Sequence, residues 1–374
     1  MPDRPLRIQH ASGKVWFLNS QALARLDLRS APEGLERDAT GAPTGRLFRG
    51  DHWLRAQLPA ADVPDLAALS RMLAGFGITG ITDTSAGNDA AQLQAFASAQ
   101  KRGALLQSAR VMGGDALGDA SGNASGNAQA GLHFDAERVE DARNNHSRLV
   151  VGERKFLLDE DDLPPVDDLV RAVQAARRQG RGTAWHCVSQ VELLYVLHVL
   201  EQAGPSGTAT RDRIEHAGVV PAPFLAALAA RGLSVVTQPA FIAERGDRYR
   251  IEADPDDVPA LYRLASLVRA GVPLGLSSDA PYGTSDPWSV MRAAVTRTTA
   301  AGAVMGPDEA LSPEAALAGY LGSAADPGGK PREIRPGAPA DLCLLHAPWT
   351  EVRERLRADV VRAVFSAGRL VVGG

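Results

Sequence analysis

The chain contains little cysteine and no long apolar run. Its 374 residues include two cysteines, Cys187 and Cys343, which are too few and too far apart for a disulfide framework or a thiolate zinc site. No apolar run approaches the roughly 20 residues that a membrane helix requires, and the opening residues lack the apolar centre of a signal peptide. The sequence therefore predicts no membrane association and a cytoplasmic location.

The chain also lacks a block of basic residues. Acidic and basic side chains are mixed along its length, with a formal net charge of -4 and a pI near 6.1. A basic surface for a phosphate backbone is missing, so nucleic acid is not an expected partner. Since 45% of the residues are hydrophobic, the chain can bury a large core.

Lysine is the scarce cation of this sequence. Of 40 basic residues only four are lysine, and Lys155 stands in the strand-like segment GERKFLLDE. A primary amine can lose its proton and react with carbon dioxide, whereas a guanidinium cannot. Random drift toward arginine is the alternative explanation, and an unmodified Lys155 could instead form a salt bridge with Asp159 or Glu153.

Short apolar runs alternate with amphipathic helical segments along most of the chain. This alternation predicts parallel β/α units. Seven candidate strands begin near residues 77, 105, 151, 182, 213, 234 and 273. A closed (β/α) barrel has eight, so the sequence predicts an α/β fold, a distorted (β/α)8 TIM-like barrel that lacks its first strand.

The character of the sequence changes near residue 335. RPGAPADLCLLHAPW and VVRAVFSAGRLVVGG are turn-bounded β segments without a predicted helix between them. We therefore expect a barrel domain over residues 1–334, incomplete at its N-terminus, and a partial small β-sandwich over residues 335–374. The stretch 113–131, rich in Gly, Ala, Asn and Ser, is predicted to be a loop.

Four polar residues occur at or near the ends of separate predicted strands. These are Lys155, His186, His216 and Asp279. Parallel barrels place their active sites at the C-terminal ends of the strands, and imidazole and carboxylate groups suit zinc or a similar divalent ion. Such an ion lowers the pKa of bound water to roughly 7, and Asp279 could accept the proton of that water and pass it to a leaving amine.

These segments resemble the amidohydrolase superfamily, in particular the branch typified by N-substituted formamide deformylase. The matching segments, in chain order, are HASGKVWFLNSQAL, KFLLDE, AWHCVSQVELL, DRIEHAG, VVTQPAF, GVPLGLSSDAPYG and RPGAPADLCLL. The resemblance implies one or two divalent metal ions, preferably zinc, with Lys155 as a carboxylated ligand beside His186, His216 and Asp279. It also implies hydrolysis of a non-peptide C–N bond in a small molecule.

One feature of that family is missing. Its first strand ends in a His-x-His pair, whereas His10, His52, His133 and His146 each stand alone here. Either the true start lies upstream, or the protein has lost this strand. The second case allows a catalytically silent barrel that binds a small molecule or a protein, or a homodimer in which another chain completes the barrel.

Substrate contacts are the least defined part of the prediction. His10, Trp16 and Asn19 lie in the segment that resembles the family near its N-terminus, and Tyr282 follows Asp279. We predict these four residues to be substrate-binding, with plain packing as the alternative for His10, Trp16 and Tyr282. Specificity is expected to depend on loops such as 113–131 and 244–249.

Overall fold

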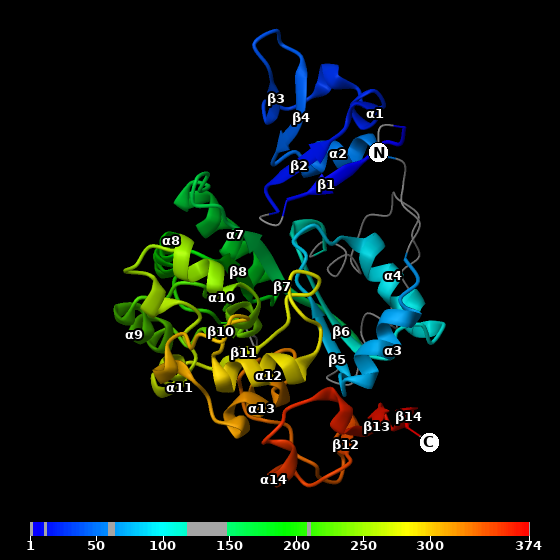
Figure 1. Ribbon diagram of the computed structural model, residues 1–374, viewed down its shortest axis with the longest axis vertical. Coiled ribbons are helices and arrows are strands. Elements are labelled where there is room, and N and C mark those ends of the chain that lie inside the picture. The colour runs from blue at the N-terminus through cyan, green and yellow to red at the C-terminus, as the bar shows by residue number, and fades with distance from the viewer. Residues whose placement is uncertain (1–2, 11–12, 59–63, 118–147, 208–210, 374) are drawn as a thin grey trace. The chain divides into compact units, whose positions relative to one another are not determined.

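The computed structural model describes residues 3–10, 13–58, 64–117, 148–207 and 211–373. The chain divides into two compact units, Met1–Pro64 and Asp65–Gly374, and each is described by itself (Figure 1). The predicted domain boundary between residues 334 and 335 stays a prediction. His133, His146 and residues 118–131 of the predicted loop lie outside the described residues.

The first unit is built on a four-stranded antiparallel sheet. The order β1-β2-β4-β3 joins short strands, namely β1 (Arg7–Gln9), β2 (Val15–Leu18), β3 (Leu35–Arg37) and β4 (Pro43–Phe48). Leu18, Leu35, Leu47 and Leu54 form its core, with helices α1 (Ser20–Leu23) and α2 (Asp51–Gln57).

The second unit contains the seven parallel strands that the sequence predicts. They follow one another in space in chain order, β11-β10-β9-β8-β7-β6-β5. Their bounds are β5 (Gly80–Asp83), β6 (Ser108–Gly113), β7 (Leu149–Leu157), β8 (Thr183–Cys187), β9 (Arg213–His216), β10 (Ser234–Thr237) and β11 (Leu274–Leu276). The sheet curls as a distorted TIM-like barrel does, which confirms the predicted fold class.

The curled sheet is open at its two ends. β5 pairs with β6 and β11 pairs with β10, and among the described residues no strand joins β5 to β11. A sheet that closes leaves no unpaired edge, so the described strands do not form a closed barrel. This arrangement agrees with the prediction of a barrel that lacks its first strand.

Alternating side chains separate the two faces of the sheet. Phe156, Trp185, Cys187 and Ile214 belong to the main apolar core, and the Phe156 and Trp185 rings stack with centroids 4.1 Å apart. Because successive side chains of a strand point to opposite faces, the residues between them, including Lys155 and His186, face the inside of the curled sheet. The concave face is therefore the polar one.

Helices cover the outer face of the sheet (Figure 1). They are α3 (Ala67–Gly75), α4 (Ala90–Lys101), α7 (Val166–Arg178), α8 (Gln190–Gln202), α9 (Ala222–Ala230), α11 (Ala265–Arg269), α12 (Pro287–Thr296) and α13 (Pro313–Leu321). Helix α10 (Ala240–Glu252) instead packs in a second apolar cluster with Leu261, Tyr262 and Met305. The prediction that residues 244–249 form a specificity loop is wrong, because they lie within α10. Gly246 does not interrupt this helix. A Cβ atom at this position would lie 2.7 Å from Thr299 Cγ2, so the glycine allows α10 to pack closely against Thr299.

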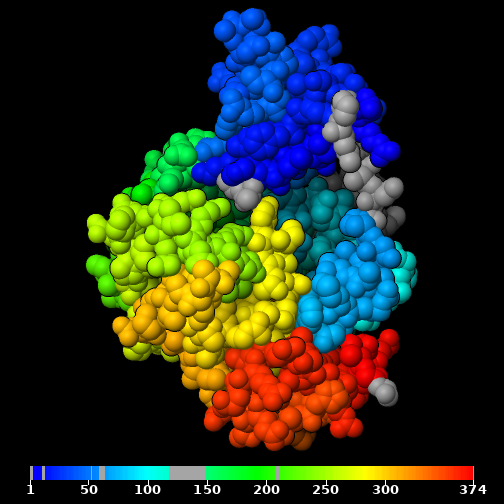
Figure 2. Space-filling model, in the orientation of Figure 1, coloured from blue at the N-terminus to red at the C-terminus, as the bar shows by residue number. Residues whose placement is uncertain are grey.

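A second, antiparallel sheet lies near the C-terminus. It has the order β12-β13-β14, with β12 (Leu342–Leu345), β13 (Val361–Ser366) and β14 (Arg369–Val372), as the β segments after residue 335 indicate. A short helix, α14 (Trp349–Val352), which the sequence did not predict, separates β12 from β13. The residues that follow α14 pack beside α12 (Figure 2), where Arg292 Nη1 donates to the carbonyl of Leu356 at 3.0 Å.

Among the described residues, no helix is both long enough and apolar enough to cross a bilayer. The predicted cytoplasmic location and the homodimer stay predictions.

Candidate active site

Two of the predicted ligands, His186 and His216, lie side by side. They stand at the C-terminal ends of the adjacent strands β8 and β9. Their ring centroids are 4.6 Å apart and the ring planes cross at 78°. This is the end of a parallel sheet at which barrel enzymes carry out their chemistry.

The backbone of His216 accounts for this approach. In the strand register His216 is paired with Cys187, whose side chain packs in the outer core, so regular alternation would direct His216 outward as well. However, His216 has φ 71° and Ala217 has φ 47°. A left-handed conformation is uncommon outside glycine, and two in succession change the direction of the side chain at the strand end.

Gln238 fixes the orientation and tautomer of the His216 ring. The amide nitrogen of Gln238 donates to Ser277 Oγ at 2.8 Å, so its carbonyl oxygen is the atom that lies 2.9 Å from His216 Nδ1. Nδ1 then carries the proton and donates, which leaves Nε2 with its lone pair. A metal-ligating histidine has this state, with one nitrogen held by the protein and the other able to bind.

Charged groups are buried beneath the two histidines. Lys155 is 6% exposed, and burial lowers the pKa of its amine, opposed by the nearby Glu215 carboxylate. Arg213 Nε lies 2.6 Å from Glu215 Oε1. Burial alone would raise the pKa of Glu215, but Arg213 and Lys155 bring it below its ordinary value. Glu153 pairs with Arg110 at 2.9 Å, and the alternative of a salt bridge from an unmodified Lys155 to Asp159 or Glu153 stays open.

Asp279 lies in the segment that follows β11. Its φ of 51° is also left-handed, and the turn after it is closed by a hydrogen bond from the Tyr282 amide to the Asp279 carbonyl, 2.7 Å long. Burial raises the pKa of the Asp279 carboxyl, while the neighbouring His216 and Lys155 lower it. Burial also lowers the pKa of His216, and the Asp279 carboxylate opposes this. The neutral imidazole, which is the ligand form, is favoured.

The donor chemistry fits a divalent ion, although the full ligand set is not assembled. In the described ranges no group of three or more His, Cys, Asp or Glu side chains is placed to hold a metal ion. What is in place is the pair of imidazoles, one of them with a fixed tautomer, next to a carboxylate and a buried amine. Nitrogen and oxygen donors of this kind suit zinc and similar ions.

The predicted substrate-binding residues have contacts of their own. The Tyr282 side chain is 47% exposed, three residues beyond Asp279. In the first unit, His10 packs edge to face on Phe17, Trp16 Nε1 donates to Asp51 Oδ1 at 2.8 Å, and the Asn19 side chain caps α1. Contact of these four residues with a substrate stays a prediction.

Sequence patterns also identify the family. A model of the amidohydrolase family matches residues 1–372. The chain belongs to the amidohydrolase family. Its similarity to N-substituted formamide deformylase of Arthrobacter pascens is 26% identity over 391 residues, which cover 92% of this chain and 69% of that enzyme. The resemblance drawn from the motifs is thereby confirmed.

Solved structures of other hydrolases share the fold of this amidohydrolase. An uncharacterized metal-dependent hydrolase from Pyrococcus horikoshii OT3 superimposes with a TM-score of 0.64 at 22% identity. One from Pyrococcus furiosus gives 0.62 at 21%. In both cases the match covers 85% of this chain and 66% of the other, so the chain spans about two thirds of the length of these proteins.

Sequence reasoning missed three residues of the site. Gln238, Arg213 and Glu215 were not singled out, although each is a polar residue in or directly after an apolar strand, the same signal that identified His186. A buried polar group requires a partner. Counting every polar position of the VVTQPAF and DRIEHAG segments would have found them.

Proposed function

We propose that this amidohydrolase hydrolyses a non-peptide C–N bond of a small molecule, such as an amide, a formamide or a cyclic amide, with the help of a divalent metal ion. The single observation that carries the proposal is the His186–His216 pair, with ring centroids 4.6 Å apart at adjacent strand ends. The hydrogen bond from His216 Nδ1 to Gln238 supports it, since it leaves Nε2 able to bind metal.

We expect one or two metal ions per chain, and we expect them to be zinc. The ligands would be His186, His216 and Asp279. Lys155 would join them as a carbamate: burial lowers the pKa of its amine, and the neutral amine is the form that reacts with carbon dioxide. When bound, the ion supplies the Lewis acidity that makes water a nucleophile at neutral pH. Asp279 would orient that water, accept its proton and deliver it to the leaving nitrogen.

A second candidate is a barrel that binds a small molecule or a protein without catalysis. The observation in its favour is that no three-residue metal group is assembled in the part of the chain that the structure describes. A binding module needs no such group. The two candidates differ in whether the purified protein contains metal.

Metal content measured by plasma mass spectrometry tests the proposal. We expect about one or two zinc ions per chain in the wild type, and loss of this zinc in His186→Ala and His216→Ala. His198→Ala is the matched control, because His198 is exposed on α8 and the zinc content should not change. If the wild type holds no metal after growth in zinc-supplemented medium, the enzyme is ruled out in favour of the binding module.

Replacing Gln238 by methionine should weaken metal binding. Methionine has a similar size but cannot accept the hydrogen bond of His216 Nδ1, so the ring loses its fixed tautomer. Loss of such an outer partner typically costs 10–100-fold in metal affinity. Competition with a fluorescent zinc chelator measures the change, and Gln94→Met on the exposed face of α4 is the control. Equal affinities for the two variants would show that Gln238 does not orient the ligand.

A further inference from the structure

Arg245 of α10 lies against the turn that carries Asp279. One of its Nη atoms donates to the carbonyl of Tyr282, which is three residues beyond Asp279. The guanidinium carbon is 3.9 Å from the centre of the Phe241 ring, at the distance of a cation–π contact. The guanidinium is thus held between an aromatic ring of its own helix and the backbone of the turn.

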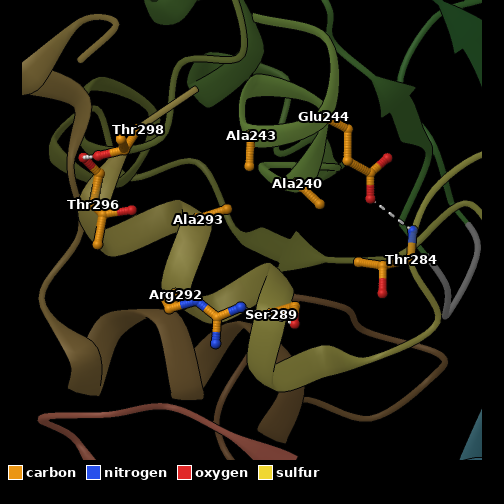
Figure 3. Close-up of a pocket in the computed structure, with 9 residues that line it drawn as sticks. All are labelled: Ala240, Ala243, Glu244, Thr284, Ser289, Arg292, Ala293, Thr296 and Thr298. Atoms are coloured by element: carbon orange, nitrogen blue, oxygen red, sulfur yellow. Dashed lines mark hydrogen bonds between the residues drawn. The ribbon is translucent and has the colours of Figure 1, made fainter. Parts of the chain in front are cut away.

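The turn itself is held closely against α10. Glu244, next to Arg245, accepts a hydrogen bond from the Thr284 amide at 3.0 Å, drawn as a dashed line in Figure 3. Gly283 packs on Phe241 so tightly that a Cβ atom there would lie 2.9 Å from Phe241 Cε1. Glu244 and Arg245 of α10 therefore both form hydrogen bonds with the segment from Asp279 to Thr284. These contacts fix the position of Arg245 relative to Asp279.

Arg245, like Arg181 and Arg297 of the same unit, donates only to backbone carbonyls in the described ranges, and it lies near enough to Asp279 to interact electrostatically with that carboxyl. Its one hydrogen bond within the described ranges goes to the Tyr282 carbonyl, and no ion pair joins it to an acidic side chain there. Other arginines of the unit pair with a carboxylate, for example Arg110 with Glu153, Arg177 with Asp212, Arg213 with Glu215, and Arg263 with Glu309. A guanidinium has five N–H donors, so Arg245 retains most of its hydrogen-bonding capacity.

We propose that Arg245 binds a carboxylate of the substrate, so that the preferred substrates are amides or formamides that also carry a carboxylate group. The inference rests on the proposed function, because it names the substrate class of the same site. A planar guanidinium recognises a carboxylate with two parallel hydrogen bonds. The contacts with Phe241 and Tyr282 fix the guanidinium in advance, which lowers the entropy cost of binding.

The test uses two compounds that differ only in the carboxylate, racemic N-formylphenylalanine and N-formyl-2-phenylethylamine. Binding is measured by calorimetry and hydrolysis by release of formate, with the zinc-loaded chain of residues 1–374. The wild type should prefer the acid in both measurements. Arg245→Gln should reduce this preference about 10-fold or more, as expected for a hydrogen bond to a charged group, and Arg245→Lys should restore part of it. Arg248→Gln is the control, since Arg248 is exposed and pairs with Glu252 on the same helix.

The outcomes separate this inference from the proposed function. If the acid binds preferentially and neither compound is hydrolysed, the substrate-class inference holds and hydrolysis of formamides fails. If Arg245→Gln weakens both compounds equally, Arg245 only holds the turn and the inference is overturned. The substrate-class inference is also overturned if the wild type binds the two compounds with equal affinity, or binds neither.

Discussion

Asp279→Asn should lower kcat/KM by about 10²–10⁴-fold, the range for loss of a general acid or base. Asparagine has nearly the shape of aspartate and tolerates the left-handed backbone that residue 279 adopts, with φ 51°. The substitution therefore leaves the turn from Asp279 to Gly283 intact. What it removes is the charge and the ability to accept a proton beside His216.

Rate and zinc content are measured together for this variant, because Asp279 is proposed both to bind metal and to move a proton. A rate loss with zinc retained assigns the effect to proton transfer, whereas loss of both assigns it to metal binding. Asp256→Asn, in the loop after α10 and exposed to solvent, is the matched control. A variant that keeps more than about a tenth of the wild-type rate would show that residue 279 does not transfer the proton, because removing such a group costs 10²-fold or more.

The parallel sheet was predictable because its strands are buried on both faces. Strand β10 is buried at every position and appears in the sequence as the short apolar run LSVVT. Strand β9 is buried as well but is RIEH, so its place follows from the regular β/α alternation around it. Helix α10 was not predictable in this way. Its segment ERGDRY is mostly charged and contains Gly246, and only the structure shows that Thr299 and Met305 occupy the space that a side chain would need.

The histidines of the site were predictable as residue types, but not their approach. Regular alternation places His186 on the inner face and His216 on the outer one, in register with Cys187. The left-handed backbone at His216 and Ala217 reverses this, and neither residue is a glycine or asparagine that would signal such a conformation. Long-range contacts between segments 22 residues apart, such as His216 with Gln238, likewise leave no local pattern.

A second large effect is expected for a buried acidic residue away from the site, Glu309. Its carboxylate pairs with Arg263 Nη1 at 2.9 Å and accepts hydrogen bonds from the backbone amides of Leu264 at 3.0 Å and Ser266 at 2.9 Å. These amides open α11, where the first N–H groups of a helix have no partner within it. Glu309 therefore joins α11 to the segment that follows α12.

Glu309→Gln should reduce the free energy of unfolding by about 3 kcal/mol at pH 7, because it leaves Arg263 buried without its counter-ion. Burial by itself would raise the pKa of Glu309, but the hydrogen bonds from Ser266, Leu264 and Arg263 bring it below the ordinary 4.5. A lowered folded-state pKa gives stability that is complete above pH 4.5 and is lost as the pH falls through the folded value.

Urea unfolding from pH 7 down to pH 3 measures both features of Glu309→Gln. The difference in the free energy of unfolding between wild type and variant should be constant down to about pH 5 and shrink below 4.5. Below that pH the Glu309 carboxylate of the wild type is protonated and loses the negative charge that the variant already lacks. Glu314→Gln, at an exposed pair with Arg353, should change little at any pH, since exposed ion pairs contribute weakly. A difference that stays constant to pH 3 would mean that the substitution acts through packing and not through the charge of Glu309.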